Sequence, residues 1–186
     1  MRIGGLGISE AAKWGETPEI QRSAQKTAEK AMTDGFVSQI QEMAKKDAQK
    51  GVYMSEDFVQ YQLSYMKRTV SPNRSRPIAQ AMAFMQRAAN QYGTLLMNLL
   101  GGYSMKAYLG VNSRYNTAEV YAPNGEMIAA QTCTGQWIDI QTEAESKFLD
   151  ECTMVYLDAY RAARAEINAA AQAPAQPAAG SVELRA

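Results

Sequence analysis

The chain has 186 residues, of which 46% are apolar and 20% are charged, and it carries no formal net charge. This length suits one domain with a buried core, and the composition is not the low-hydrophobicity, high-charge composition of a disordered chain. The sequence contains no histidine, which removes the commonest general base and argues against zinc sites and Ser-His-Asp catalysis.

Residues 1–15 predict a flexible N-terminal segment without a signal peptide, because Glu10 and Lys13 fall where an apolar run would have to be. No other segment approaches the ~18 consecutive apolar residues that cross a bilayer. The two cysteines, Cys133 and Cys152, are too few for a disulfide framework. These features predict a cytoplasmic protein with ordinary thiols, and they leave non-standard secretion open.

Three helices are expected between residues 16 and 70. Thr17 and Pro18 form a good first turn, and a polar helix follows to about residue 32. Apolar residues at helical spacing predict a second helix up to Gly51, although the sequence leaves open whether the chain breaks or only bends at 33–35. Ser55 is placed to cap the third helix, over 55–70.

The longest apolar stripe follows a turn at 70–77 that contains two prolines. It runs from Ile78 to Leu99 at spacings of three and four, and it predicts a long helix that Gly101 and Gly102 end. We expect this helix to be the centre of the core. The residues expected to be mostly buried are Met82, Met85, Leu95, Leu96, Trp137, Leu149 and Tyr156.

A three-stranded antiparallel meander is predicted at about 118–140. Its strands are 118–122, 126–132 and 136–140, and the turns between them are Pro-Asn-Gly and Thr-Gly. Thr142 and Glu145 then have the spacing of a capping box, which predicts a terminal helix to about residue 167.

The expected fold class is therefore α+β and predominantly helical. It has about five helices, with a small three-stranded meander between the two longest. We expect residues 16–171 to form a single domain, and the Ala- and Pro-rich residues 172–186 to be a disordered tail.

The neutral net charge conceals a strong segregation of charge along the chain. Residues 58–118 contain seven Lys and Arg residues and no Asp or Glu, whereas residues 119–186 contain ten acids and four bases. Such asymmetry bears on association more than on fold. The basic residues that we select as candidates for interaction are Lys67, Arg68, Arg74, Arg76 and Arg87.

No motif in the sequence names a reaction or a ligand, and we predict no enzyme activity, cofactor, metal, membrane or small-molecule substrate. The first hypothesis is an interaction or assembly protein that uses its segregated basic and acidic faces to bind a protein partner or a second copy. The alternative is a nucleic-acid- or phosphate-binding protein that uses the basic turn at 67–76, and it requires that the acidic C-terminal helix does not mask this turn. The third is an enzyme that works without histidine.

Overall fold

The computed structural model describes residues 18–88, 91–112, 114 and 116–172. The helices are α1 (Pro18–Ala31), α2 (Asp34–Lys50), α3 (Glu56–Thr69), α4 (Ser75–Arg87) and α5 (Glu143–Gln172). The strands are β1 (Gly93–Asn98), β2 (Ser104–Leu109), β3 (Thr117–Tyr121), β4 (Met127–Gln131) and β5 (Trp137–Asp139). The class is α+β, as predicted, and the expected segment 1–15 and nearly all of the expected tail lie outside the described residues.

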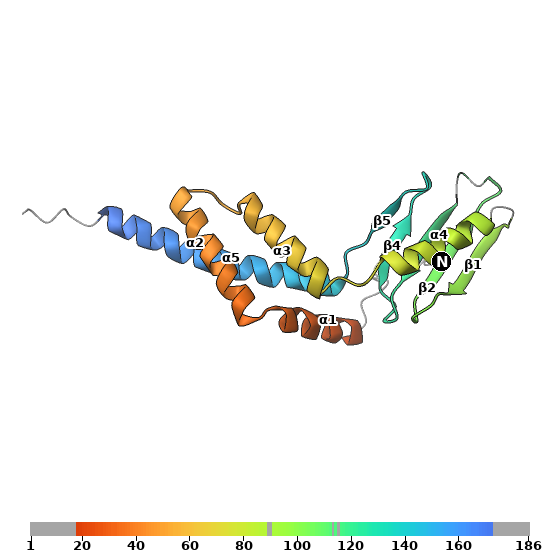
Figure 1. Cartoon of the computed structure of the whole chain (residues 1–186), viewed down its shortest axis with the longest axis horizontal. Coiled ribbons are helices and arrows are strands. Elements are labelled where there is room, and N and C mark those ends of the chain that lie inside the picture. The colour runs from red at the N-terminus through yellow and green to blue at the C-terminus, as the bar shows by residue number, and fades with distance from the viewer. Residues whose placement is uncertain (1–17, 89–90, 113, 115, 173–186) are drawn as a thin grey trace, which may run out of the picture.

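Helices α1, α2, α3 and α5 form one end of an elongated molecule, and α4 with the sheet forms the other (Figure 1). The helical core, as we call the apolar cluster at the first end, lies where α5 packs on the other three helices. Its fully buried aromatic residues are Phe58, Phe148 and Tyr156. The rings of Phe58 and Tyr156 stack with their centroids 4.2 Å apart.

Local capping residues set the ends of these helices. The chain breaks between α1 and α2, where the Thr33 hydroxyl accepts a hydrogen bond from the Phe36 N–H at 3.4 Å. The predicted cap of α3 is confirmed, because the Ser55 hydroxyl accepts from the Phe58 N–H at 3.4 Å. The loop between α2 and α3 is anchored on α5, since the Tyr156 hydroxyl accepts from the Met54 N–H and donates to the Asp47 carboxylate, both at 2.8 Å.

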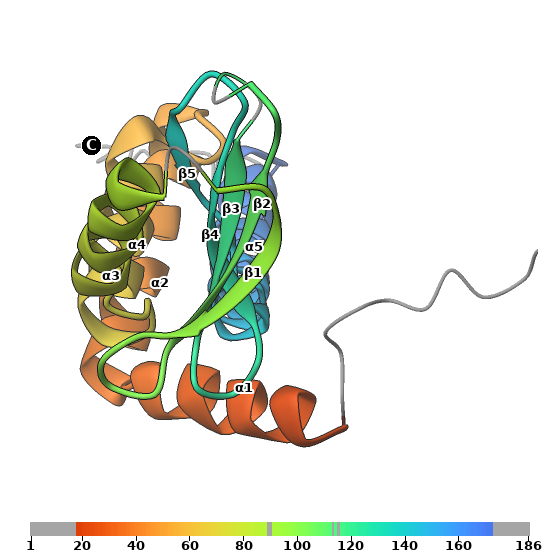
Figure 2. The same cartoon turned by 90° about the vertical axis from the view of Figure 1, so that its right-hand side faces the viewer.

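The five strands form one antiparallel sheet in the order β1-β2-β3-β4-β5. The predicted meander is therefore present as β3, β4 and β5, but β1 and β2 extend it. Helix α4 covers one face of this sheet (Figure 2). The sheet core, the apolar cluster between them, consists of Ala81, Ala88, Met105, Ala107, Leu109, Ala118, Val120, Ile128 and Ala129.

The prediction of one long helix from Ile78 to Leu99 is wrong. Helix α4 ends at Arg87, Gly93 has a φ of 97°, and Leu95 and Leu96 lie in β1. Leu95 and Leu99 fit a helical period, but with Met97 between them they also alternate as in a strand, and β2 supplies the hydrogen-bonding partner. The two glycines that follow make the turn into β2, with φ of 81° and 79°.

The predicted burial changes with this correction. Leu96 is 77% exposed and Met82 is 44% exposed, so neither is a core residue. Leu96 lies on the side of the sheet away from α4, whose own contacts with the sheet core are made by small residues, Ala81 and the C-cap residue Ala88. Tyr156 is fully buried as predicted. The other four predicted core residues, Met85, Leu95, Trp137 and Leu149, are only half-buried.

Candidate functional site

The sheet face that points away from α4 is the first candidate site, and we call it the outer face. Buried residues of β2 and β3 alternate with residues on the opposite side, as side chains in strands must. In Figure 2 the described helices leave most of this face uncovered. The outer face consists of Thr94, Leu96, Asn98, Ser104, Lys106, Tyr108, Thr117, Glu119, Tyr121, Ala130 and Ile138.

A cluster of polar aromatic residues occupies the centre of the outer face. The Glu119 carboxylate accepts hydrogen bonds from the Tyr121 hydroxyl at 2.7 Å and from the Tyr108 hydroxyl at 3.0 Å. The Lys106 ammonium lies 4.9 Å from the centroid of the Tyr108 ring, and Lys106 is paired with Glu119 across the strands. Partial burial and then the Glu119 carboxylate raise the pKa of Tyr121. At the centre of the outer face, the positive charge of Lys106 thus lies beside the negative charge of Glu119.

Two apolar side chains extend this cluster toward the two edges of the sheet. Leu96 on β1 is 77% exposed, and Ile138 on β5 is 45% exposed. The register places Leu96 opposite Lys106 and Ile138 opposite Ala130. The outer face therefore combines two tyrosines with exposed aliphatic groups, a composition that is frequent in protein–protein contacts.

The second candidate site lies at the junction of the two cores, where Arg74 is almost completely enclosed. Its guanidinium binds both oxygens of the Glu145 carboxylate, at 2.6 and 2.9 Å. It also donates to the carbonyl oxygens of Ile128 at 2.9 Å and Ile140 at 2.7 Å. The Arg74 side chain is 12% exposed and that of Glu145 is 3% exposed. Ser71 donates a further hydrogen bond to this carboxylate.

The same carboxylate also caps α5, as the sequence predicts. The Glu145 side chain accepts from the Thr142 N–H at 2.8 Å, and the Thr142 hydroxyl accepts from the Glu145 N–H at 3.3 Å. In addition, the Glu126 carboxylate, just after the Pro-Asn-Gly turn, accepts from the Glu143 N–H at 2.9 Å. The sheet is thus attached to the start of α5 by hydrogen bonds, and Arg74 is held inside the chain.

This network makes stability depend on pH in the acid range. Burial alone would raise the pKa of Glu145, but hydrogen bonds from Arg74, Ser71 and Thr142 outweigh it and lower the pKa from 4.5 to about 2. The unfolded chain therefore binds a proton first as pH falls. We expect the free energy of unfolding to drop by about 3 kcal/mol between pH about 4.5 and about 2 from this group. Urea unfolding at several pH values should show that the free energy of unfolding falls less steeply with decreasing pH in Glu145→Gln than in the unchanged protein. Equal pH dependence in the two proteins would contradict the lowered pKa of Glu145.

The other four basic candidates are exposed, and Lys67 lines the same open groove of about 730 Å³ as Arg74 and Glu145. Lys67 and Arg68 lie in the last turn of α3, and Arg76 lies in the first turn of α4. Arg68 lies over the Tyr65 ring, 5.7 Å from its centroid. Arg87, at the end of α4, donates to a carbonyl of its own helix.

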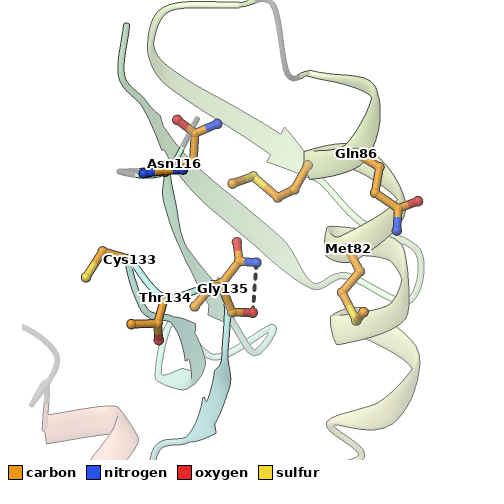
Figure 3. A pocket seen from close by; sticks show the side chains of 9 residues that line it. Met82, Gln86, Asn116, Cys133, Thr134 and Gly135 are labelled. Carbon is orange, nitrogen blue, oxygen red and sulfur yellow. Dashed lines mark hydrogen bonds between the residues drawn. The ribbon is translucent and has the colours of Figure 1, made fainter. Parts of the chain in front are cut away.

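An open groove of about 600 Å³ lies between α4 and the loops at one end of the sheet (Figure 3). Met82, Gln86, Asn116 and Thr134 are among the nine residues that line it. The amide group of Gln131 donates to the Gly135 carbonyl at 3.3 Å. None of the nine lining residues is an acid, so the groove can make hydrogen bonds and apolar contacts but offers no carboxylate to act as a base.

The two cysteines lie in different surroundings. Cys133 is exposed in the turn between β4 and β5 and belongs to the groove. Cys152 is buried in the helical core, where burial and then the nearby Glu151 raise its pKa to about 12. The Cys152 thiol is thus protonated at neutral pH and poorly nucleophilic.

Comparisons of the chain with family models, with curated proteins and with solved structures gave no match. The fold defines the class as α+β, with an antiparallel sheet that has one helix-covered face. Within the described residues, no helix is long and apolar enough to cross a membrane.

The outer face is the feature that sequence reasoning missed. Strand β2 reads Ser-Met-Lys-Ala-Tyr-Leu, in which polar and apolar residues alternate strictly. This period of two was the available signal for a strand with one buried and one solvent-facing side. Recognising it would have placed Lys106 and Tyr108 together on one surface.

Proposed function

We propose that this chain is a non-enzymatic interaction or assembly protein whose binding surface is the outer face of its sheet. The observation that carries the proposal is that the described residues leave this face largely uncovered, with exposed Leu96 and Ile138 on it beside a tyrosine cluster. Larger exposed apolar surfaces that are rimmed by polar residues often mark sites of protein–protein interaction. The helical core serves as the scaffold that holds the sheet through Arg74.

The chemistry of the outer face favours a protein partner. Lys106 and Glu119 are paired across β2 and β3, so the centre of the face offers neither a cationic nor an anionic patch. A partner would cover the aliphatic groups and the faces of Tyr108 and Tyr121, with polar contacts at the margin. A polyanion would gain little from such a surface.

Site-specific photo-cross-linking in cells that produce the protein tests this proposal. A benzophenone amino acid at Ile138, on the outer face, should give a discrete adduct with a protein partner. The matched control is the same probe at Met154, an apolar residue on α5 that is 60% exposed. Equal adduct patterns from both positions, or none from position 138, would contradict a binding role for this face.

The nucleic-acid alternative makes a different prediction at the basic turn. It depends on Lys67, Arg68 and Arg76, because Arg74 is already bound to Glu145. Replacement of these three residues by alanine would then abolish a gel shift that has a steep salt dependence. We expect no such shift at physiological ionic strength, and its observation would favour the alternative over the outer-face proposal.

A further inference from the structure

Among the described residues, β1 has no strand on its outer edge, and its composition is unusual for such an edge. Strand β1 is an edge of the sheet, and its sequence Gly-Thr-Leu-Leu-Met-Asn has no charge and no proline. Proteins normally protect sheet edges from other strands with charged residues, prolines, bulges or very short strands. Strand β1 has six residues, pairs with β2 without a register shift, and has none of these protections.

The opposite edge of the same sheet shows the contrast. Strand β5 has only three residues, and Asp139 at its end is 73% exposed. Asp139 also lies 3.9 Å from the Arg74 guanidinium, so this edge carries charge and lies close to the helical core. In Figure 1, β1 lies at the far end of the molecule from the helical core, whereas β5 lies beside it. A strand can therefore approach β1 without meeting the helical core.

The hydrogen-bond pattern shows which residues of β1 are available at this edge. The Leu99 N–H donates to the Tyr103 carbonyl at 2.8 Å, so these two residues form a hydrogen-bonded pair. Bonded and non-bonded pairs alternate along an antiparallel ladder. The N–H and C=O groups of Thr94, Leu96 and Asn98 therefore point away from β2, toward the free edge.

We infer that β1 pairs antiparallel with β1 of a second copy about a two-fold axis at Leu96, giving one continuous ten-stranded sheet. This register bonds Leu96 to Leu96 of the second copy and Thr94 to Asn98 of the second copy. All three outward-facing residues of each strand then find partners. When a charged strand pairs with its own copy, like charges can come to lie opposite each other, and this destabilises the pair. Strand β1 carries no charge, so its self-pairing has no such cost.

The side chains fit the same register. Leu96, 77% exposed in one copy, would contact its equivalent across the axis on the outer face. On the α4 side, Leu95 would lie opposite Met97 of the second copy, and both residues are only half-buried in one copy. The two outer faces would join into a single wider surface. This inference goes beyond the proposed function, because it concerns the edge of the sheet and a second copy of the chain.

Sedimentation and light scattering over about 5 to 500 μM protein test the pairing, since an edge of this size belongs to the small interfaces. We expect the mass of the full chain to rise from one copy to two. Leu96→Lys should weaken dimerisation by at least about tenfold, because it sets two ammonium groups face to face. The matched control Ile138→Lys adds the same charge to the outer face at the protected edge and should dimerise like the unchanged protein.

A charge-exchange experiment tests the register. Leu96→Glu alone should also be monomeric, but an equimolar mixture of Leu96→Lys and Leu96→Glu should recover the dimer, because opposite charges then meet at the axis. A mass that stays at one copy up to the highest concentration would overturn the inference. So would a Leu96→Lys variant that dimerises like the unchanged protein.

Hydrogen exchange on the unchanged chain gives a result that does not depend on the variants. The amides of Thr94, Leu96 and Asn98 should gain protection as concentration rises, whereas the amide of Asp139, which faces the opposite edge of the sheet, should not. Equal protection of the three β1 amides at all concentrations would overturn the pairing. If the chain stays monomeric but the probe at position 138 still forms its adduct, the pairing of β1 is wrong and the proposed function stands. If the chain dimerises but no adduct forms at position 138, the pairing stands and the proposed function is wrong.

Discussion

Replacing Arg74 with methionine should lower the free energy of unfolding by about 3–5 kcal/mol. The change leaves the buried Glu145 carboxylate without its bidentate partner, and an uncompensated buried charge is among the most destabilising defects in a protein. It also leaves the Ile128 and Ile140 carbonyl oxygens without their guanidinium donor. Urea unfolding followed by far-ultraviolet circular dichroism would measure the loss.

The control is the arginine two residues further along. Arg76 is exposed, so Arg76→Met should change the free energy of unfolding by no more than about 0.5 kcal/mol. In the double variant Arg74→Met, Glu145→Gln, no carboxylate charge is stranded, so its loss should be smaller than the sum of the two single losses. Equal losses in the free energy of unfolding for Arg74→Met and Arg76→Met would show that the buried ion pair between Arg74 and Glu145 does not stabilise the protein.

In the Arg74→Met variant, the helical core and the sheet core should unfold at different urea concentrations. The two apolar clusters are distinct, and the Arg74 network is a polar link between them. Trp137 packs against the sheet core, so its fluorescence reports on that core, whereas circular dichroism reports mostly on the helices. Trp14 is the other tryptophan of the sequence, so it is replaced by phenylalanine to leave Trp137 as the fluorescent probe. In this Trp14→Phe parent we expect the unfolding transitions followed by fluorescence and by circular dichroism to coincide. After Arg74→Met we expect them to diverge. Coincident transitions in both would contradict the linking role.

Phe148→Ala should cost about 3–5 kcal/mol of the free energy of unfolding. Phe148 is fully buried on α5, and its ring stacks on Phe36 and Tyr65 with centroids 5.5 and 6.1 Å away. Truncation removes the buried ring and leaves a cavity where α2, α3 and α5 meet. Thermal and urea unfolding of the purified variant would measure this.

A second apolar residue of the same helix provides the comparison. Met154 is 60% exposed on α5, so Met154→Ala should stay within about 0.5 kcal/mol of the parent. Both changes place alanine inside α5, beyond its first turn, so helix propensity separates them little. A similar loss for both variants would mean that the buried face of α5 is assigned wrongly.

The sequence by itself determined those elements whose signals are local. The caps at Ser55 and Thr142, the turns of the meander and the helical periodicity of α2 and α3 involve residues within a few positions of one another. Their physical basis is a backbone donor or acceptor that a nearby side chain can satisfy, or a φ angle that only certain residues adopt. Strands β3, β4 and β5 and four of the five helices follow from these signals.

Only the tertiary structure decided that residues 93–109 form strands and not a helix, and that Arg74 is enclosed. Leu95 and Leu99 satisfy a helical period and, with Met97, also a strand period, and the presence of β2 as a hydrogen-bonding partner selects the strand. Arg74 and Arg76 look alike in the sequence, yet Arg74 alone is placed against Glu145, a residue 71 positions away. Such pairing depends on how the two cores meet, because a charge is enclosed only where distant segments converge around it.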